Sequence, residues 1–202
     1  MQNHETDNIV KEPDLSYSNY SYADYLTWTF DEMIELIKGR VFKTNAAPKR
    51  LHQKISLQLA SGLYQFLQGK ACEVYEAPFD VRLPVKSKRN EDIDTVVQPD
   101  ICVICDKEKL DDVGCIGAPD LIIEILSQGN NKKELKYKYE VYEESGVKEY
   151  CIIHPDEHTL LIYTLINNEY QPSRLFTHGD IITSGVLPGF QLDLSRLFSN
   201  LD

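Results

Sequence analysis

A single acidic residue, Glu124, interrupts the most apolar stretch of the chain, residues 121–126 with the sequence LIIEIL. Side chains alternate between the two faces of a strand, so a run that is apolar on both faces indicates a strand in the centre of a sheet. An unpaired ionised carboxylate would cost several kcal/mol or more in that environment. We therefore expect a cationic group beside Glu124.

A second stretch with the same character lies earlier in the chain. Residues 96–105 read VVQPDICVIC, a strand pattern in which Asp100 is the single acidic residue. If this strand pairs with the one that carries Glu124, the two carboxylates can share one divalent cation.

A lysine on the next predicted element can supply positive charge to the same place. Residues 131–145 have the pattern of a helix, with Leu135, Tyr139 and Tyr142 forming an apolar stripe. At about 100° per residue, Lys138 lies roughly 60° from Leu135 and roughly 40° from Tyr142 around the axis, so it leans toward the core. Two other interpretations stay open: a structural Lys138–Glu124 ion pair, or a Lys138 stem that reaches to solvent.

Length and composition fit one globular domain. The chain has 202 residues, 42% of them hydrophobic, enough for a sizeable core. Residues 1–21 are polar and aperiodic and predict a mobile arm, which leaves residues 22–202 as the domain. The start lacks a secretory signal and no stretch approaches the roughly 20 apolar residues of a membrane span, so we expect a cytoplasmic protein without a membrane partner.

Charge and cysteine usage restrict the function classes further. A formal net charge of −11 argues against a nucleic-acid partner without excluding it, because basic residues lie close to the candidate strands. Five cysteines is an odd number for a disulfide framework, so reduced, packed thiols are expected. A zinc site at Cys102 and Cys105 would need further ligands, and Cys115 is the nearest candidate in sequence.

The order of predicted elements indicates an α+β domain with a mixed sheet. A Thr29-to-Glu32 capping box predicts a helix over residues 33–38 that ends at Gly39, and Pro48 opens a longer helix that runs to about residue 67. Further strands are expected at residues 40–42, 72–75, 79–83, 149–154, 159–165, 170–175 and 180–182, with a polar loop at 84–94 and a short helix after residue 193.

Two acids and a lysine from neighbouring elements are suited to phosphodiester hydrolysis. Asp100 and Glu124 would hold Mg²⁺ or Mn²⁺, and Lys138 would position water or offset developing charge. The sequence has no P-loop, no Gly-x-Ser-x-Gly, no Gly-x-Gly-x-x-Gly and no His-Glu-x-x-His, so no other nucleophile is indicated.

Four segments in order resemble the signature segments of the Uma-two family of endonucleases, which belongs to the restriction-endonuclease-like PD-(D/E)XK superfamily. They are residues 34–39 (IELIKG), 97–101 (VQPDI), 118–127 (APDLIIEILS) and 146–150 (GVKEY). The resemblance implies a restriction-endonuclease-like αβββαβ core, a mixed central sheet flanked by helices, and a metal-dependent endonuclease. By the same resemblance the substrate is nucleic acid, DNA rather than RNA, and the enzyme is a homodimer.

One departure from the superfamily pattern concerns the amine. The lysine of the D/E-x-K motif falls at position 126, where this chain has Leu126. The Uma-two pattern has a lysine on the following helix, which matches Lys138. The resemblance also assigns supporting roles to Glu134 and to Glu35, an acid on the first helix. Glu35 can either complete the metal shell or cap a surface.

One further residue, His52, completes the predicted site, and Asp120 is expected to lie outside it. His52 matches a family histidine near the start of the second helix, where it can orient a phosphate or a carboxylate or serve the structure alone. Asp120 is expected to be a hydrogen-bonding residue at the strand entry and not a ligand.

Two other functions remain open at the level of sequence. The missing D/E-x-K lysine and the acidic charge are compatible with a non-catalytic module that binds nucleic acid or protein. A metal-dependent hydrolase of smaller phosphoesters is the third possibility, because the surface around a site determines the size of its substrate.

Overall fold

The computed structural model describes residues 19–28, 33–43, 49–127 and 132–199. Its helices are α1 (Tyr22–Tyr25), α2 (Arg50–Leu67), α3 (Lys132–Ser145) and α4 (Leu194–Leu197), with 3-10 turns η1 (Asn90–Asp92) and η2 (Lys107–Lys109). Its strands are β1 (Ile34–Ile37), β2 (Arg40–Lys43), β3 (Glu73–Glu76), β4 (Asp80–Arg82), β5 (Val96–Val97), β6 (Ile101–Ile104), β7 (Leu110–Asp111), β8 (Gly114–Ile116), β9 (Leu121–Ile125), β10 (Glu149–His154), β11 (Thr159–Ile166), β12 (Glu169–Pro172), β13 (Ile181–Thr183) and β14 (Gln191–Asp193).

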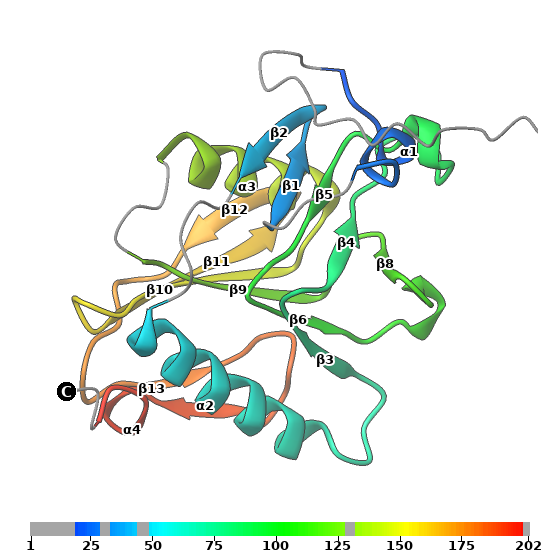
Figure 1. Ribbon diagram of the computed structural model, residues 1–202. Coiled ribbons are helices and arrows are strands. Elements are labelled where there is room, and N and C mark those ends of the chain that lie inside the picture. The colour runs from blue at the N-terminus through cyan, green and yellow to red at the C-terminus, as the bar shows by residue number, and fades with distance from the viewer. Residues whose placement is uncertain (1–18, 29–32, 44–48, 128–131, 200–202) are drawn as a thin grey trace, which may run out of the picture.

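The main sheet has the strand order β12-β11-β10-β9-β6-β3 (Figure 1). Strands β9 and β10 are parallel, and the other neighbours are antiparallel. The sheet is therefore mixed, as expected. Every residue of β9 is buried, and β9 lies between β10 and β6. The prediction that Glu124 lies on a central strand is confirmed.

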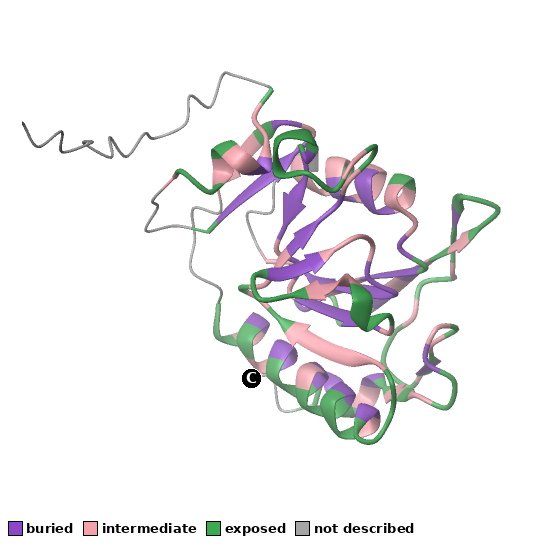
Figure 2. Cartoon of the chain, turned by 90° about the vertical axis from the view of Figure 1, so that its right-hand side faces the viewer, coloured by how far each residue is buried: buried purple, intermediate pink, exposed green. Residues whose placement is uncertain are grey.

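Helices α2 and α3 cover opposite faces of the main sheet (Figure 1). Ile123 and its neighbours on one face pack against α2, whereas Ile122 packs in the cluster that contains Tyr142 of α3. Because alternate side chains of a strand point to opposite faces, Glu124 lies on the α3 face together with Ile122. The central strands β6 and β9 are buried throughout, whereas the strands toward the edges of the sheet carry exposed residues. The exposed residues of α2 lie on the outer side of that helix (Figure 2).

The smaller N-terminal layer differs from the prediction. Residues 34–37 form strand β1 of a second sheet, with the order β2-β1-β5-β4-β8-β7, where the sequence predicted a helix. All four residues are buried, so the segment has no polar face of the kind a surface helix presents. The capping-box residues 29–32 lie outside the described residues.

A two-residue hairpin turn explains the difference. Ile37 pairs with Arg40 across the turn, and Lys38 and Gly39 both have positive φ angles, of 51° and 72°. Positive φ at both central positions is typical of type I′ hairpin turns, for which glycine carries no steric penalty. Gly39 thus ends a strand, and not a helix as the sequence predicted.

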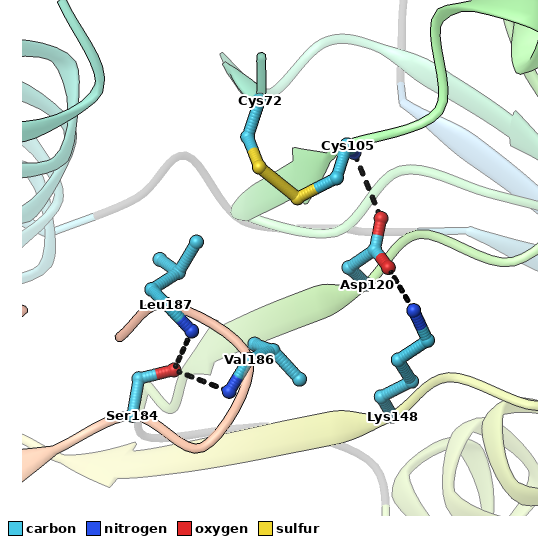
Figure 3. The surroundings of a disulfide bond; sticks show 7 residues. All are labelled: Cys72, Cys105, Asp120, Lys148, Ser184, Val186 and Leu187. Carbon is cyan, nitrogen blue, oxygen red and sulfur yellow. Dashed lines mark hydrogen bonds and ion pairs between the residues drawn. A yellow bond between two sulfur atoms is a disulfide. The ribbon is translucent and has the colours of Figure 1, made fainter. Parts of the chain in front are cut away.

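The prediction that all cysteines are reduced is wrong for one pair. Cys72 and Cys105 form a disulfide between the segments flanking β3 and β6 (Figure 3). Glu73 pairs with Ile104 in the antiparallel ladder, so the next positions along the two chains face each other. The expected buried thiols are found at Cys102, Cys115 and Cys151.

Asp120 has the structural role that the sequence predicted. It directly precedes β9 and accepts hydrogen bonds from the Cys105 backbone N–H at 2.8 Å and from Lys148 Nζ at 2.6 Å (Figure 3). Burial raises the pKa of Asp120, but Lys148 and the Cys105 amide outweigh that effect, so the net pKa is lowered. Asp120 therefore joins the entry of β9 to the end of β6.

Tyr20, Tyr22 and Tyr25 pack against the domain. Tyr22 on α1 is 1% exposed and lies in a cluster with Leu36, Ile93 and Val96. Residues 1–18, most of the predicted arm, lie outside the described residues. In the part of the chain that is described, no helix has the length and apolar character needed to cross a membrane.

Candidate active site

The pairing of β6 with β9 brings the two predicted acids together. Ile101 pairs with Ile123, so the next position along the ladder places Asp100 opposite Glu124. Asp100 Oδ2 accepts a hydrogen bond of 2.7 Å from the backbone N–H of Ile125. The carboxylate of Asp100 is thus fixed to the strand that carries Glu124.

Lys138 on α3 is the cationic partner of Glu124. Its Nζ lies 3.0 Å from Glu124 Oε1, and the two residues are 5% and 6% exposed. The prediction that Lys138 turns toward the core is confirmed. Burial lowers the pKa of Lys138, but the carboxylates of Glu124 and Glu35 outweigh it and raise the pKa well above its ordinary value. The lysine is therefore an ammonium ion.

Burial is the main influence on Glu124. It raises the pKa of Glu124 to about 7, with the charges of Asp100 and Glu35 acting in the same direction and Lys138 opposing them. A carboxyl group with a pKa so far above its ordinary value is characteristic of functional sites, where burial and like charges gather.

Tyr142 is a site residue that the sequence reasoning missed. Its hydroxyl donates a hydrogen bond of 2.7 Å to Glu124 Oε1, and the residue is fully buried. The sequence showed it as part of an apolar stripe together with Tyr139. A signal was present, since a buried tyrosine hydroxyl usually needs a partner and Tyr142 lies one turn beyond Lys138.

Glu35 reaches the site from strand β1. Its Oε1 lies 2.9 Å from Lys138 Nζ and accepts a 2.7 Å hydrogen bond from the backbone N–H of Gln98. At 4% exposure it cannot cap a surface. The predicted residue therefore does belong to the site, although it arrives on a strand and not on a first helix.

His52 lies in the first turn of α2, with Nε2 3.1 Å from Asp100 Oδ1. Burial lowers its pKa, but the contact with Asp100 and the charges of Glu124 and Glu76 outweigh this, so the net pKa is raised. Nδ1 is buried and has no hydrogen-bond partner among the described residues. His52 thus holds one oxygen of Asp100, as the resemblance implied for a carboxylate-orienting residue.

Glu134 lies one turn before Lys138 on α3 and is partly buried. Burial raises its pKa, while the charge of Lys138 opposes the shift. Glu134 therefore lies within electrostatic range of the lysine, at the margin of the group formed by Glu124, Glu35 and Lys138.

A second polar network, also missed from sequence, adjoins Gln98. Its side-chain amide donates to Asp80 Oδ1 at 2.7 Å, and the Tyr25 hydroxyl lies 3.4 Å from the same oxygen. Burial is the main reason that the pKa of Tyr25 is raised, with the charge of Asp80 adding to it. These contacts fix the segment that leads through Pro99 to Asp100.

The donor set fits a hard divalent cation. Asp100 and Glu124 offer carboxylate oxygens, the ligands that Mg²⁺ and Mn²⁺ prefer. The Asp100 side chain is 22% exposed, so a cation has access from solvent. No group of three or more histidine, cysteine, aspartate or glutamate residues arranged to hold a metal occurs among the described residues. Two protein carboxylates with the remaining positions left to water and phosphate are typical of Mg²⁺ sites.

Comparison with known proteins identifies the family. The model of the Uma2 family, described as "Putative restriction endonuclease", matches residues 22–195. The chain belongs to the Uma2 family. This membership, which confirms the Uma-two resemblance, places the chain among restriction-endonuclease-like nucleases. A search of curated proteins found no match.

The fold of this Uma2 protein is shared with a solved structure. A nuclease from Anabaena variabilis ATCC 29413, described as putative and as belonging to DUF820, superposes with a TM-score of 0.73 at 19% sequence identity. The match covers 90% of this chain and 99% of the other. The predicted restriction-endonuclease-like α+β fold is confirmed by this likeness.

Proposed function

We propose that this Uma2 protein is a Mg²⁺- or Mn²⁺-dependent endonuclease that hydrolyses phosphodiester bonds of DNA. The observation that carries the proposal is the buried contact of Lys138 with Glu124, directly beside Asp100 on the paired strand. The restriction-endonuclease description of the family favours DNA over RNA.

The charge of the site supports a divalent cation. When all three carboxylates are ionised and His52 is neutral, Asp100, Glu124 and Glu35 place three negative charges against the one ammonium of Lys138, an excess of two. Excess charge is costly to bury, and a dication bound between Asp100 and Glu124 neutralises it.

Each residue has a definite task in the proposed reaction. Asp100 and Glu124 would hold the cation, which when bound polarises the phosphoryl oxygen and acidifies the attacking water. Lys138 positions that water or offsets the negative charge that develops on the phosphoryl group. Tyr142 fixes the orientation of the Glu124 carboxylate, and His52 does the same for Asp100. No covalent intermediate with the protein is needed.

The test is cleavage of supercoiled DNA, and of single-stranded DNA and RNA in parallel, with and without Mg²⁺ or Mn²⁺. We expect metal-dependent cleavage that falls at least 10²-fold in Asp100→Asn and Glu124→Gln. The matched control is Asp120→Asn, which removes a buried carboxylate near the start of β9 that lies outside the site. Cleavage that persists in Glu124→Gln or in the presence of chelator would refute this site.

The same assay distinguishes the proposed endonuclease from the main alternative, a non-catalytic binding module. A non-catalytic binding module, suggested by Leu126 at the position of the usual lysine, would retain DNA without metal-dependent turnover. Its affinity for DNA would not change in Asp100→Asn or Glu124→Gln.

A further inference from the structure

Lys138 contacts two carboxylates that come from different sheets. Its ammonium lies 2.9 Å from Glu35 Oε1 on β1 and 3.0 Å from Glu124 Oε1 on β9. All three side chains are 8% exposed or less, so water cannot take the place of either contact. One ammonium is therefore shared between Glu124, a proposed metal ligand, and Glu35, whose task in the proposed reaction has not been specified so far.

Glu35 also holds the chain that leads to the second metal ligand. The oxygen that contacts Lys138 accepts the backbone N–H of Gln98 at 2.7 Å, two residues before Asp100. A single carboxylate thus connects α3 to the Gln98–Asp100 segment.

The arrangement creates a conflict that Glu35 can resolve. A cation on Glu124 competes with the Lys138 ammonium for the same carboxylate, and the two positive charges repel each other at short range. The buried ammonium would lose its partner if Glu124 were its single counter-ion, at a high cost. With Glu35 as the second counter-ion, Lys138 can release Glu124 and remain in the site.

We propose that Glu35 is a positioning residue that takes over the Lys138 ammonium when a divalent cation binds Glu124. This inference rests on the function proposed above. Glu35 acts through Lys138 and does not contact the cation. The protein can therefore admit the metal and keep the amine beside the reacting phosphate at the same time.

The test is Mn²⁺ binding, measured by calorimetry and by the electron paramagnetic resonance signal of free Mn²⁺, without DNA. Among the described residues, Glu35→Gln leaves Glu124 as the one carboxylate in direct contact with the ammonium. The ammonium then competes with the metal for Glu124, so we expect affinity for Mn²⁺ to fall about tenfold or more. Replacing Lys138 by Met in the same chain removes the competitor. Glu35→Gln/Lys138→Met should therefore recover the affinity lost in Glu35→Gln, which a general structural defect would not do.

Turnover supplies a second, independent measurement. If Glu35 acts through Lys138, Glu35→Gln lowers kcat in the native background but has no further effect in a Lys138→Met background. Asp120→Asn is the matched control, because Asp120, like Glu35, accepts hydrogen bonds from a lysine and from a backbone N–H. Asp120 lies at the start of β9, whereas Glu124 lies near the end of that strand. It should leave Mn²⁺ affinity unchanged.

The outcomes separate the two proposals. If the wild-type protein binds no Mn²⁺, the proposed function is overturned and this inference with it. The same holds if wild type and Asp100→Asn have equal affinity for Mn²⁺. Wild-type protein that binds through Asp100, combined with unchanged affinity in Glu35→Gln, overturns the role of Glu35 alone. A double variant that binds no better than Glu35→Gln also overturns it. Should Glu35→Gln fail to fold, Lys138→Met and Glu35→Gln/Lys138→Met are compared instead, and a lower Mn²⁺ affinity or kcat in the double variant than in Lys138→Met would refute the coupling.

Discussion

Tyr142 and Tyr150 offer a direct measurement of what the hydroxyl contact with Glu124 contributes. Both rings are fully buried and lie 5.0 Å apart between centroids. The Tyr142 hydroxyl donates to Glu124 at 2.7 Å, whereas the buried Tyr150 hydroxyl has no hydrogen-bond partner among the described residues. The same substitution, tyrosine to phenylalanine, therefore removes a charge-assisted hydrogen bond at one position and an unsatisfied hydroxyl at the other.

The two variants should differ clearly in stability. A hydrogen bond to a charged group is worth about 1.5 to 3 kcal/mol, so Tyr142→Phe should lower the free energy of unfolding by about that amount. For a protein of this size the loss corresponds to a Tm decrease of roughly 3 to 12 °C. Tyr150→Phe removes a buried polar group without a partner, so we expect no loss of stability or a small gain.

The assay is urea unfolding of wild type and both variants at pH 8, followed by circular dichroism and by tyrosine fluorescence. Equal m-values would show that the variants unfold from the same native state. Tyr142→Phe should also weaken Mn²⁺ binding, because Glu124 loses a donor that fixes its orientation. Equal destabilisation by the two substitutions would refute the view that the Tyr142 hydroxyl supports the carboxylate.

Two further outcomes are expected. Because burial raises the pKa of Glu124 to about 7, metal binding must release its proton below that pH, so Mn²⁺ affinity should rise up to tenfold per pH unit below pH 7 and level off above it. Calorimetry in buffers of different ionisation enthalpy checks this, and an affinity that does not change between pH 5.5 and 7 contradicts it. The Cys72–Cys105 disulfide closes a sequence separation of 33 residues, so the Cys72→Ser/Cys105→Ser variant should lose between about 3 and 4 kcal/mol in urea unfolding. Reductant should lower the stability of wild type by a similar amount and leave the variant unaffected.

The buried contact between Glu124 and Lys138 was predictable because a charged residue in an apolar segment needs a partner of opposite charge. A glutamate within an apolar strand requires a partner wherever the strand lies. The period of the helix was enough to predict that Lys138 points toward the same core. The spacing of residues along the chain determines both features, whatever the packing of distant elements.

The predictions that were wrong and the features that were missed depend on pairing or contact between distant segments. Residues 34–37 are too few to distinguish a strand period from a helix period, and the Lys38-Gly39 turn was interpreted as a helix end. The disulfide follows from the register of β3 against β6, which a count of cysteines does not contain. The hydrogen bond from the Tyr142 hydroxyl to Glu124 was missed because the sequence pattern shows Tyr142 only as a member of an apolar stripe.

The origin of the amine on α3 changes which parts of this protein can vary over evolution. Position 126 no longer has to supply the lysine of the site, so Leu126 can contribute to packing alone. Under the proposed function the rotation of α3 about its axis becomes a requirement of the site instead. A slip of one residue turns a helix by about 100° and would carry Lys138 out of reach of both carboxylates. We therefore expect relatives to accept changes in length between β9 and α3 readily, provided that the aromatic packing of Tyr139 and Tyr142 against the sheet keeps the angle of the helix.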